Sequence, residues 1–244
     1  LVFSPHPDDE VITGGIGLRL LREAGWRVVN VAVTLGSDRA RRAERDAEGA
    51  ACCDYIGFER VLAAPSGLEG VNLDGRQRDV RRWAAGVQRI ADILVQHAPR
   101  AVCFPHAGDW NQTHMGTHQL LVDALAALGP GLRVLTLETE FWGAMSAPNL
   151  MLELGADDVA SLVAALACHV GEVRRNPYHL SLPAWMIDNV RRGSELVLGQ
   201  GAAAPAFTFA TLYRLRRWEN GAFAPLLARG CALSVHDDVD ALIR

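Results

Sequence analysis

The sequence contains no lysine, and all 24 of its basic residues are arginine. We attribute this bias mainly to a G+C-rich genome, with bidentate recognition of carboxylate or phosphate groups as a secondary explanation. The 28 acidic residues leave a formal net charge of -4. This balance gives no electrostatic reason to expect nucleic acid as a partner.

Long apolar runs are also missing. No uninterrupted stretch reaches the roughly 18 apolar residues that indicate a transmembrane helix, and nothing resembles a signal peptide. The five cysteines are odd in number and lack the spacing of a zinc finger. Small buried thiols in a reducing compartment explain them most simply. We therefore expect a cytoplasmic protein without an integral membrane segment.

Strand-like and helix-like segments alternate through the first 150 residues. This rhythm predicts an α/β fold with a doubly wound, mostly parallel, Rossmann-like sheet and helices on both faces. We expect one domain over residues 1–244, with the core sheet in 1–150 and a C-terminal extension in 151–244 that lines the pocket. The expected strands are 1–3, 27–34, 61–63, 101–105 and 132–139, and the expected helices are 15–24, 39–56, 76–96 and 115–128. In the extension we expect helices over 157–175 and 186–197 and a strand or hairpin at the sheet edge over 205–217.

A dinucleotide site is the obvious competitor on such a sheet. Residues 13–17, Thr-Gly-Gly-Ile-Gly, lack the Gly-x-Gly-x-x-Gly spacing. The turn that should cradle the pyrophosphate carries several carboxylates, which would repel it. We reject a dinucleotide-binding function on these grounds.

Residues 5–10, Pro-His-Pro-Asp-Asp-Glu, are the most informative segment. They follow an expected strand, where an open α/β sheet places its reactive groups. His6 and Asp9 can each offer a lone pair to a divalent metal, while Asp8 can stay unligated and accept a proton. His114, which follows the expected strand 101–105, offers a third ligand. Two histidines and one carboxylate leave a coordination position open, as in catalytic zinc sites, so hydrolysis is the first reaction to consider.

A plainer interpretation is that residues 5–10 only start a helix, with Asp8 or Asp9 as its N-cap. That role explains one acidic residue. It does not explain three acids preceded by a histidine that is held between two prolines. We therefore favour the metal site, and we assign weight to His114 because it pairs with His6.

This chain resembles the PIG-L/LmbE-like family of zinc-dependent N-deacetylases. The resemblance rests on residues 5–10 and is supported by the Gly14-Gly15 helix, the strand 28–34, the Arg45-x-x-Glu48 helix and the His114 segment. It implies that His6, Asp9 and His114 hold zinc and that Asp8 is the general base. A substrate-binding role for Arg45 is also suggested by the family, although Arg45 and Glu48 are most simply a surface ion pair.

One position departs from the family pattern. The family commonly carries His-Pro-Asp-His where this chain has Asn111-Gln112-Thr113-His114. Asn111 can donate a hydrogen bond to an oxyanion but cannot protonate a leaving group. Asp8 would then return its proton to the amine, and His106 or His169 would assist from nearby.

Further residues at expected strand ends are candidates for substrate binding. We assign Asp109, Trp110 and Glu140 to this role, and we expect Trp110 and Trp142 to line a pocket, since aromatic faces stack on sugar rings. Residues 65–67, Pro-Ser-Gly, lack the acidic residue that precedes Ser-Gly in thiol-biosynthesis members, so a mycothiol-type substrate is disfavoured.

The sequence thus predicts a zinc-dependent hydrolase that removes an N-acetyl or longer N-acyl group from an amino sugar in a glycoside or glycoconjugate. Two other classes stay open. The same ligands serve non-haem iron oxygenases, and the altered second motif is consistent with a non-catalytic sugar-binding relative. We expect a small-molecule partner and leave open whether the chain forms a homo-oligomer.

Overall fold

The computed structural model describes residues 1–243. Successive residues of its first strand, β1 (Val2–Ser4), face two different hydrophobic layers, because side chains alternate along a strand. Val2 packs into one core cluster and Phe3 into the other. Strand β4 (Ala101–Pro105) repeats this pattern, with Cys103 in the first cluster and Phe104 in the second. A strand buried on both faces explains why these segments are continuously apolar.

The sheet within the described residues follows the order β3-β2-β1-β4-β5-β7-β6-β9, and β8 pairs with β7. Strands β3 to β5 in this order are all parallel to their neighbours, with Val2 paired to both Asn30 and Cys103. The strand order reverses between β1 and β4, which is where open α/β sheets bind ligands. The remaining bounds are β2 (Val29–Ala32), β3 (Glu59–Leu62), β5 (Val134–Thr139), β6 (Leu150–Leu154), β7 (Phe209–Glu219), β8 (Ala222–Pro225) and β9 (Cys231–Leu233).

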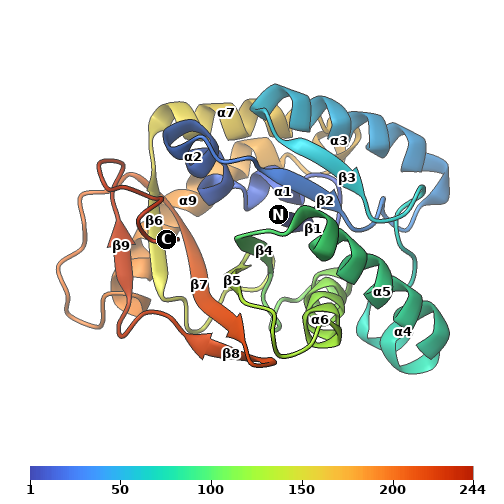
Figure 1. Ribbon diagram of the computed structural model, residues 1–244. Coiled ribbons are helices and arrows are strands. Elements are labelled where there is room, and N and C mark those ends of the chain that lie inside the picture. The colour runs from blue at the N-terminus through green and yellow to red at the C-terminus, as the bar shows by residue number, and fades with distance from the viewer. Residues whose placement is uncertain (244) are drawn as a thin grey trace.

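Helices cover both faces of the sheet, as predicted (Figure 1). Helices α2 (Gly15–Ala24), α3 (Arg42–Ile56) and α7 (Ala156–Leu166) contribute to the first core cluster. Helices α5 (Val80–His97) and α6 (Gln112–Ala127) contribute to the second. Three short elements also precede α6 in the chain: α1 (Asp9–Ile12), a 3-10 turn (Arg39–Arg41) and α4 (Leu73–Arg78).

One glycine on α6 shapes the wall of the site. A Cβ at Gly116 would lie 2.5 Å from the carbonyl group of Val71, so only glycine lets the loop around residues 71–72 approach this helix. Val71 and Asn72 belong to the lining of the cavity described below.

The C-terminal extension differs from its prediction in three ways. The expected edge strand is β7, and it lies inside the sheet, antiparallel to both β5 and β6. The expected helix over 157–175 is two helices, α7 and α8 (Val170–Arg175), and the last helix, α9 (Tyr178–Leu196), begins earlier than expected and continues through Pro183. No helix in residues 1–243 is both long and apolar enough to span a membrane.

Candidate metal centre and active site

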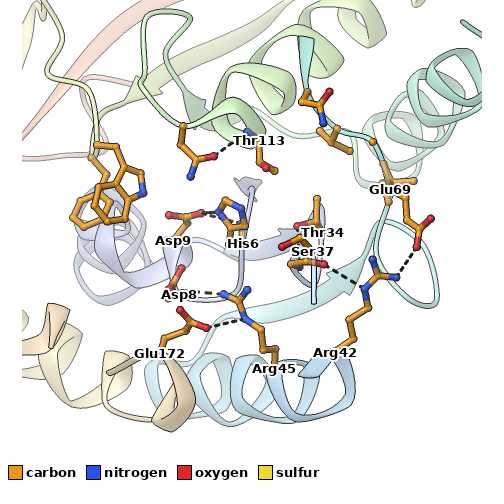
Figure 2. Close-up of a pocket in the computed structure, with 18 of the residues that line it drawn as sticks. His6, Asp8, Asp9, Thr34, Ser37, Arg42, Arg45, Glu69, Thr113 and Glu172 are labelled. Carbon is orange, nitrogen blue, oxygen red and sulfur yellow. Dashed lines mark hydrogen bonds and ion pairs between the residues drawn. The ribbon is translucent and has the colours of Figure 1, made fainter. Parts of the chain in front are cut away.

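The loops that follow β1, β2 and β4 meet around one cavity of about 510 Å3. The segment after β1 supplies His6, Asp8 and Asp9, and α6, after β4, supplies Thr113 together with its cap, Asn111. The cavity therefore lies at the carboxyl ends of the parallel strands, at the reversal of strand order. Figure 2 shows Asp9 beside His6 and Arg45 between Asp8 and Glu172.

Three side chains converge as the sequence predicted. The Oδ2 atom of Asp9 lies 3.4 Å from Nδ1 of His6 and 3.3 Å from Nε2 of His114. All three ligand atoms fall within 4.8 Å of one another. The backbone N–H of His6 also donates to Asp9 Oδ2, over 2.9 Å, which fixes the carboxylate at the turn.

These residues fit a tetrahedral divalent metal such as zinc. Zinc bonds of about 2.0–2.1 Å place neighbouring tetrahedral ligand atoms about 3.3–3.4 Å apart, as the Asp9 pairs are here. The Nε2 atom of His114 is buried and has no hydrogen-bond partner among the described residues. Such an orphaned nitrogen beside a carboxylate is the donor set that a metal would satisfy.

Electrostatics at His114 also favour a cation. Burial lowers the pKa of this imidazole, but the charge of Asp9 and the close contacts of Asp109 and Asp9 with the ring nitrogens outweigh burial and raise the pKa to about 10. The pKa of Asp9 is in turn depressed, since His114 and His6 outweigh its burial. The geometry therefore demands positive charge between these groups, which a proton or a divalent cation can provide.

Asp8 lies beside the three convergent side chains but does not belong to them. Burial and the neighbouring charge of Asp9 raise the pKa of the Asp8 carboxyl well above its ordinary value of 3.8, while Arg45, 4.0 Å away, acts in the opposite direction. A carboxyl that is buried, lines the cavity and is drawn toward its protonated form is suited to proton exchange.

Asn111 serves as the N-cap of α6. Its Oδ1 atom accepts the backbone N–H groups of Thr113 and His114, at 2.8 and 3.4 Å. Because the oxygen is engaged in capping, the amide nitrogen is the side-chain atom that remains to donate into the cavity.

Two residues that we assigned to catalysis or substrate binding are turned away from the cavity. His106 is buried, with Nε2 2.6 Å from the Gly143 carbonyl and Nδ1 accepting the Gly108 N–H, so both ring nitrogens support a loop. Glu140 is buried and ion-paired with Arg192. This geometry corrects both assignments, because neither side chain can reach a substrate without breaking these contacts.

The residues next to Asn111 also differ from expectation. Asp109 is buried, with Oδ2 3.4 Å from His114 Nδ1 and Oδ1 accepting the Asn111 N–H, so it contacts His114 and does not line the cavity. Trp110 is 77% exposed and does not line the cavity, whereas Trp142 does.

Arg45 and Glu48 are buried, so the surface ion pair expected from their spacing was wrong. Arg45 lines the cavity and interacts with Asp8 and Glu172. Glu48 accepts the Gly171 N–H. His169 is fully buried against Glu10, so it cannot assist the reaction directly.

The extension lines the cavity through residues that the sequence analysis missed, among them Tyr178 and Glu172. Tyr178 and Trp142 pack edge to face, with ring centroids 5.5 Å apart, and Phe141 joins them to form an aromatic wall. Glu172 lines the cavity from α8. Residues 176–185 contain two prolines, Tyr178 and Trp185, and this composition is the sequence signal that could have indicated Tyr178. No sequence signal marked Glu172.

Comparison with known proteins places this architecture among related folds. A family model described as PIG-L, GlcNAc-PI de-N-acetylase, matches residues 1–125. Among curated proteins, none matches this chain.

Solved structures share the fold at low identity. A conserved protein of Thermus thermophilus is 18% identical with a TM-score of 0.64, covering 87% of this chain and 92% of that one. The N,N'-diacetylchitobiose deacetylase of Pyrococcus horikoshii is 14% identical with a TM-score of 0.62, covering 90% and 83%. The 4-carboxy-2-hydroxymuconate hydratase of Pseudomonas putida is 17% identical with a TM-score of 0.61, covering 88% and 94%. One fold thus hosts different chemistries, and the reaction must be argued from the site.

Proposed function

The chain belongs to the PIG-L family, and on that premise we propose that it is a zinc-dependent N-deacetylase acting on an amino sugar within a glycoside or glycoconjugate. The observation that carries the proposal is the convergence of His6, Asp9 and His114 beside an unligated, buried Asp8. This arrangement combines a metal site with a separate proton acceptor, as amide hydrolysis requires.

The three convergent side chains would hold the zinc. Zinc held there would supply Lewis-acid chemistry, polarising a carbonyl group and making water more acidic. Asp109 would fix the ring orientation of His114 through Nδ1, which leaves Nε2 to face the metal.

Asp8 would act first as a general base and then as a general acid. It takes a proton from the attacking water as the new C–O bond forms on the acetyl carbon. It then returns that proton to the sugar nitrogen as the C–N bond breaks, so that acetate and a free amine are the products. One group acts as base and then as acid, and Asn111 is not needed for protonation.

Asn111 would hold the oxyanion that develops on the acetyl oxygen. Asn111 lines the cavity while its side-chain oxygen is engaged in capping α6, which leaves the amide N–H groups to donate. Donors placed in this way contribute a few kcal/mol to the transition state, roughly 2.7–4 kcal/mol in a measured case.

The cavity walls favour a sugar as the substrate. Phe141, Trp142 and Tyr178 form one wall, and the apolar face of a pyranose ring stacks well on such side chains. Polar groups line much of the remainder, including Thr34, Ser37 and Asn72, which can bond hydroxyl groups.

Two other functions make different predictions. An iron oxygenase with the same ligands would require Fe(II) and O2, and the base beside the ligands would have no role in its chemistry. A non-catalytic sugar-binding relative would bind glycosides without releasing acetate.

The experiment is an acetate-release screen over N-acetylglucosaminides with the purified, zinc-loaded protein, repeated after chelation and with Fe(II) under air. Acetate and free amine in equal amounts, lost on chelation and restored by zinc, would support the proposal. Binding of the panel without acetate release, or turnover only with Fe(II) and O2, would overturn it.

A further inference from the structure

The peptide group between Pro7 and Asp8 is held on both sides by charged side chains. Its carbonyl oxygen accepts a hydrogen bond from Arg45 Nη2 at 3.0 Å, and its N–H donates to Glu10 Oε2 at 2.9 Å. The backbone of Asp8 has φ 124° and ψ -29°, a conformation that residues other than glycine rarely adopt. Strain of this kind persists only where the surroundings enforce it.

Both clamping side chains are supported from one short segment, residues 169–172 at the start of α8. His169 Nε2 lies 2.8 Å from Glu10 Oε1, and neither side chain is exposed. Glu172 Oε1 lies 3.6 Å from Arg45 Nε. Gly171 donates its N–H to Glu48 on α3, which fixes the segment against that helix.

The clamp also restricts the Asp8 carboxylate. Arg45 lies 4.0 Å from Asp8 Oδ2 while bonding the preceding carbonyl, so one guanidinium contacts both the backbone and the side chain of this residue. Figure 2 shows Arg45 between Asp8 and Glu172. The direction in which Asp8 presents its carboxylate therefore depends on contacts made by the C-terminal extension.

A second metal site is the alternative explanation for the buried cluster of Glu10, Cys52 and His169. The 2.8 Å contact between Glu10 and His169 is a hydrogen-bond distance and is shorter than the roughly 3.3 Å between ligands of tetrahedral zinc. Burial also raises the pKa of the Cys52 thiol, which keeps it protonated. This cluster is better suited to supporting the Pro7–Asp8 peptide than to binding a metal ion.

We propose that residues 169–172 are a positioning segment: His169 through Glu10, and Glu172 through Arg45, hold the Pro7–Asp8 peptide in its strained conformation and so aim the Asp8 carboxylate at the reacting water. This inference rests on the proposed function of Asp8. It assigns a catalytic contribution to a part of the chain outside the 125 residues that match the family model.

The test compares His169→Leu, which removes the donor to Glu10, with His169→Gln, whose amide can still donate. We expect His169→Leu to keep one zinc per chain and a KM within about twofold, while kcat falls about tenfold to a hundredfold, as small misplacements of a catalytic group do. His169→Gln should restore most of kcat. Unchanged kcat in a folded, zinc-loaded His169→Leu protein would overturn the proposal, as would an equal loss in both variants.

Hydrogen exchange at the Asp8 backbone amide tests the positioning role without a substrate. A failure of this proposal can therefore be distinguished from a failure of the proposed function. The protection that the Glu10 carboxylate gives to this N–H should fall in His169→Leu and recover in His169→Gln, even if no deacetylase substrate is found. If His169→Leu does not fold, Glu172→Gln carries the test through Arg45 and should lower kcat several-fold with KM and zinc content retained. Full wild-type kcat in that variant, or unchanged Asp8 protection in His169→Leu, would contradict the positioning role.

Discussion

The Oδ2 atom of Asp109 lies 3.4 Å from Nδ1 of His114, on the opposite side of the ring from Asp9. A carboxylate behind a metal-binding histidine fixes the ring and raises its basicity. Asp109→Asn should therefore weaken zinc affinity about tenfold to a hundredfold, as measured by competition with a chelator. The amide oxygen of this variant can still accept the Asn111 N–H, so the loop should be preserved. Unchanged affinity would show that Asp109 does not support the ligand.

Variants of Asp8 and His114 should separate the loss of catalysis from the loss of metal binding. Asp8→Asn should keep zinc but lower kcat by about a hundredfold to ten-thousandfold, the usual value of general-base assistance. His114→Ala, the matched control, should lose most of its zinc while retaining the fold. Zinc content by elemental analysis together with acetate release measures both. Loss of zinc from Asp8→Asn would make Asp8 a ligand.

Asn111 combines a cap with an oxyanion donor, and two variants separate these roles. Asn111→Ala should lose about 1 kcal/mol of folding stability with the cap and lower kcat about tenfold to a thousandfold. Asn111→Ser keeps a capping oxygen, so its stability should recover while kcat stays low. Urea unfolding and steady-state kinetics measure the two effects. Full activity in Asn111→Ala would mean that another group holds the oxyanion.

The backbone of Asp8 predicts an unusual effect on stability. At φ 124°, glycine should avoid a strain of about 1–3 kcal/mol, against an entropic cost of about 0.5–1 kcal/mol for ordering glycine. Asp8→Gly should therefore unfold at a higher urea concentration than Asp8→Ala, although both lack the carboxylate. Equal midpoints, or a more stable alanine variant, would show that the conformation carries no strain.

Glu172 predicts a pH dependence of stability. Burial raises the pKa of this carboxyl, but hydrogen bonds and charges of Arg175, Arg45 and Arg41 outweigh burial and lower it below the ordinary 4.5. A group with a depressed pKa stabilises the fold above its unfolded pKa, and the contribution disappears as the pH falls through the folded pKa. Glu172→Gln should thus be less stable than wild type at pH 7, and the difference should shrink below about pH 4.5. A difference that is constant between pH 7 and pH 3 would contradict the ionic role.

The convergence of His6, Asp9 and His114 could be predicted from sequence because it depends on local and topological rules. His6, Asp8 and Asp9 occupy one turn after a buried strand, and His114 follows another. Parallel strands end at the same edge of a sheet, so these side chains meet without any knowledge of packing. The departure from the family pattern at Asn111 could also be seen in the sequence. Asn111 lines the cavity, and its role in the reaction stays a prediction.

The supporting residues could not be predicted in this way. His169 reaches Glu10 across 159 positions of sequence, and Arg192 reaches Glu140 across 52. No periodicity or spacing encodes such contacts, because they depend on how the extension packs against the sheet. The placement of β7 inside the sheet was missed for the same reason, since alternation marks a strand but not its neighbours. A cytoplasmic location stays a prediction, and the oligomeric state stays open.

The central claim is that water is added across an N-acyl bond at the site formed by His6, Asp9, His114 and Asp8. Single-turnover reactions of the zinc-loaded protein in 18O-labelled water, followed by mass spectrometry of the released acetate, test it most directly. We predict one solvent-derived 18O atom in each acetate from wild type and almost no acetate from Asp8→Asn in the same time. Acetate without the label, a product whose label comes from 18O2, or equal release by Asp8→Asn would contradict the account.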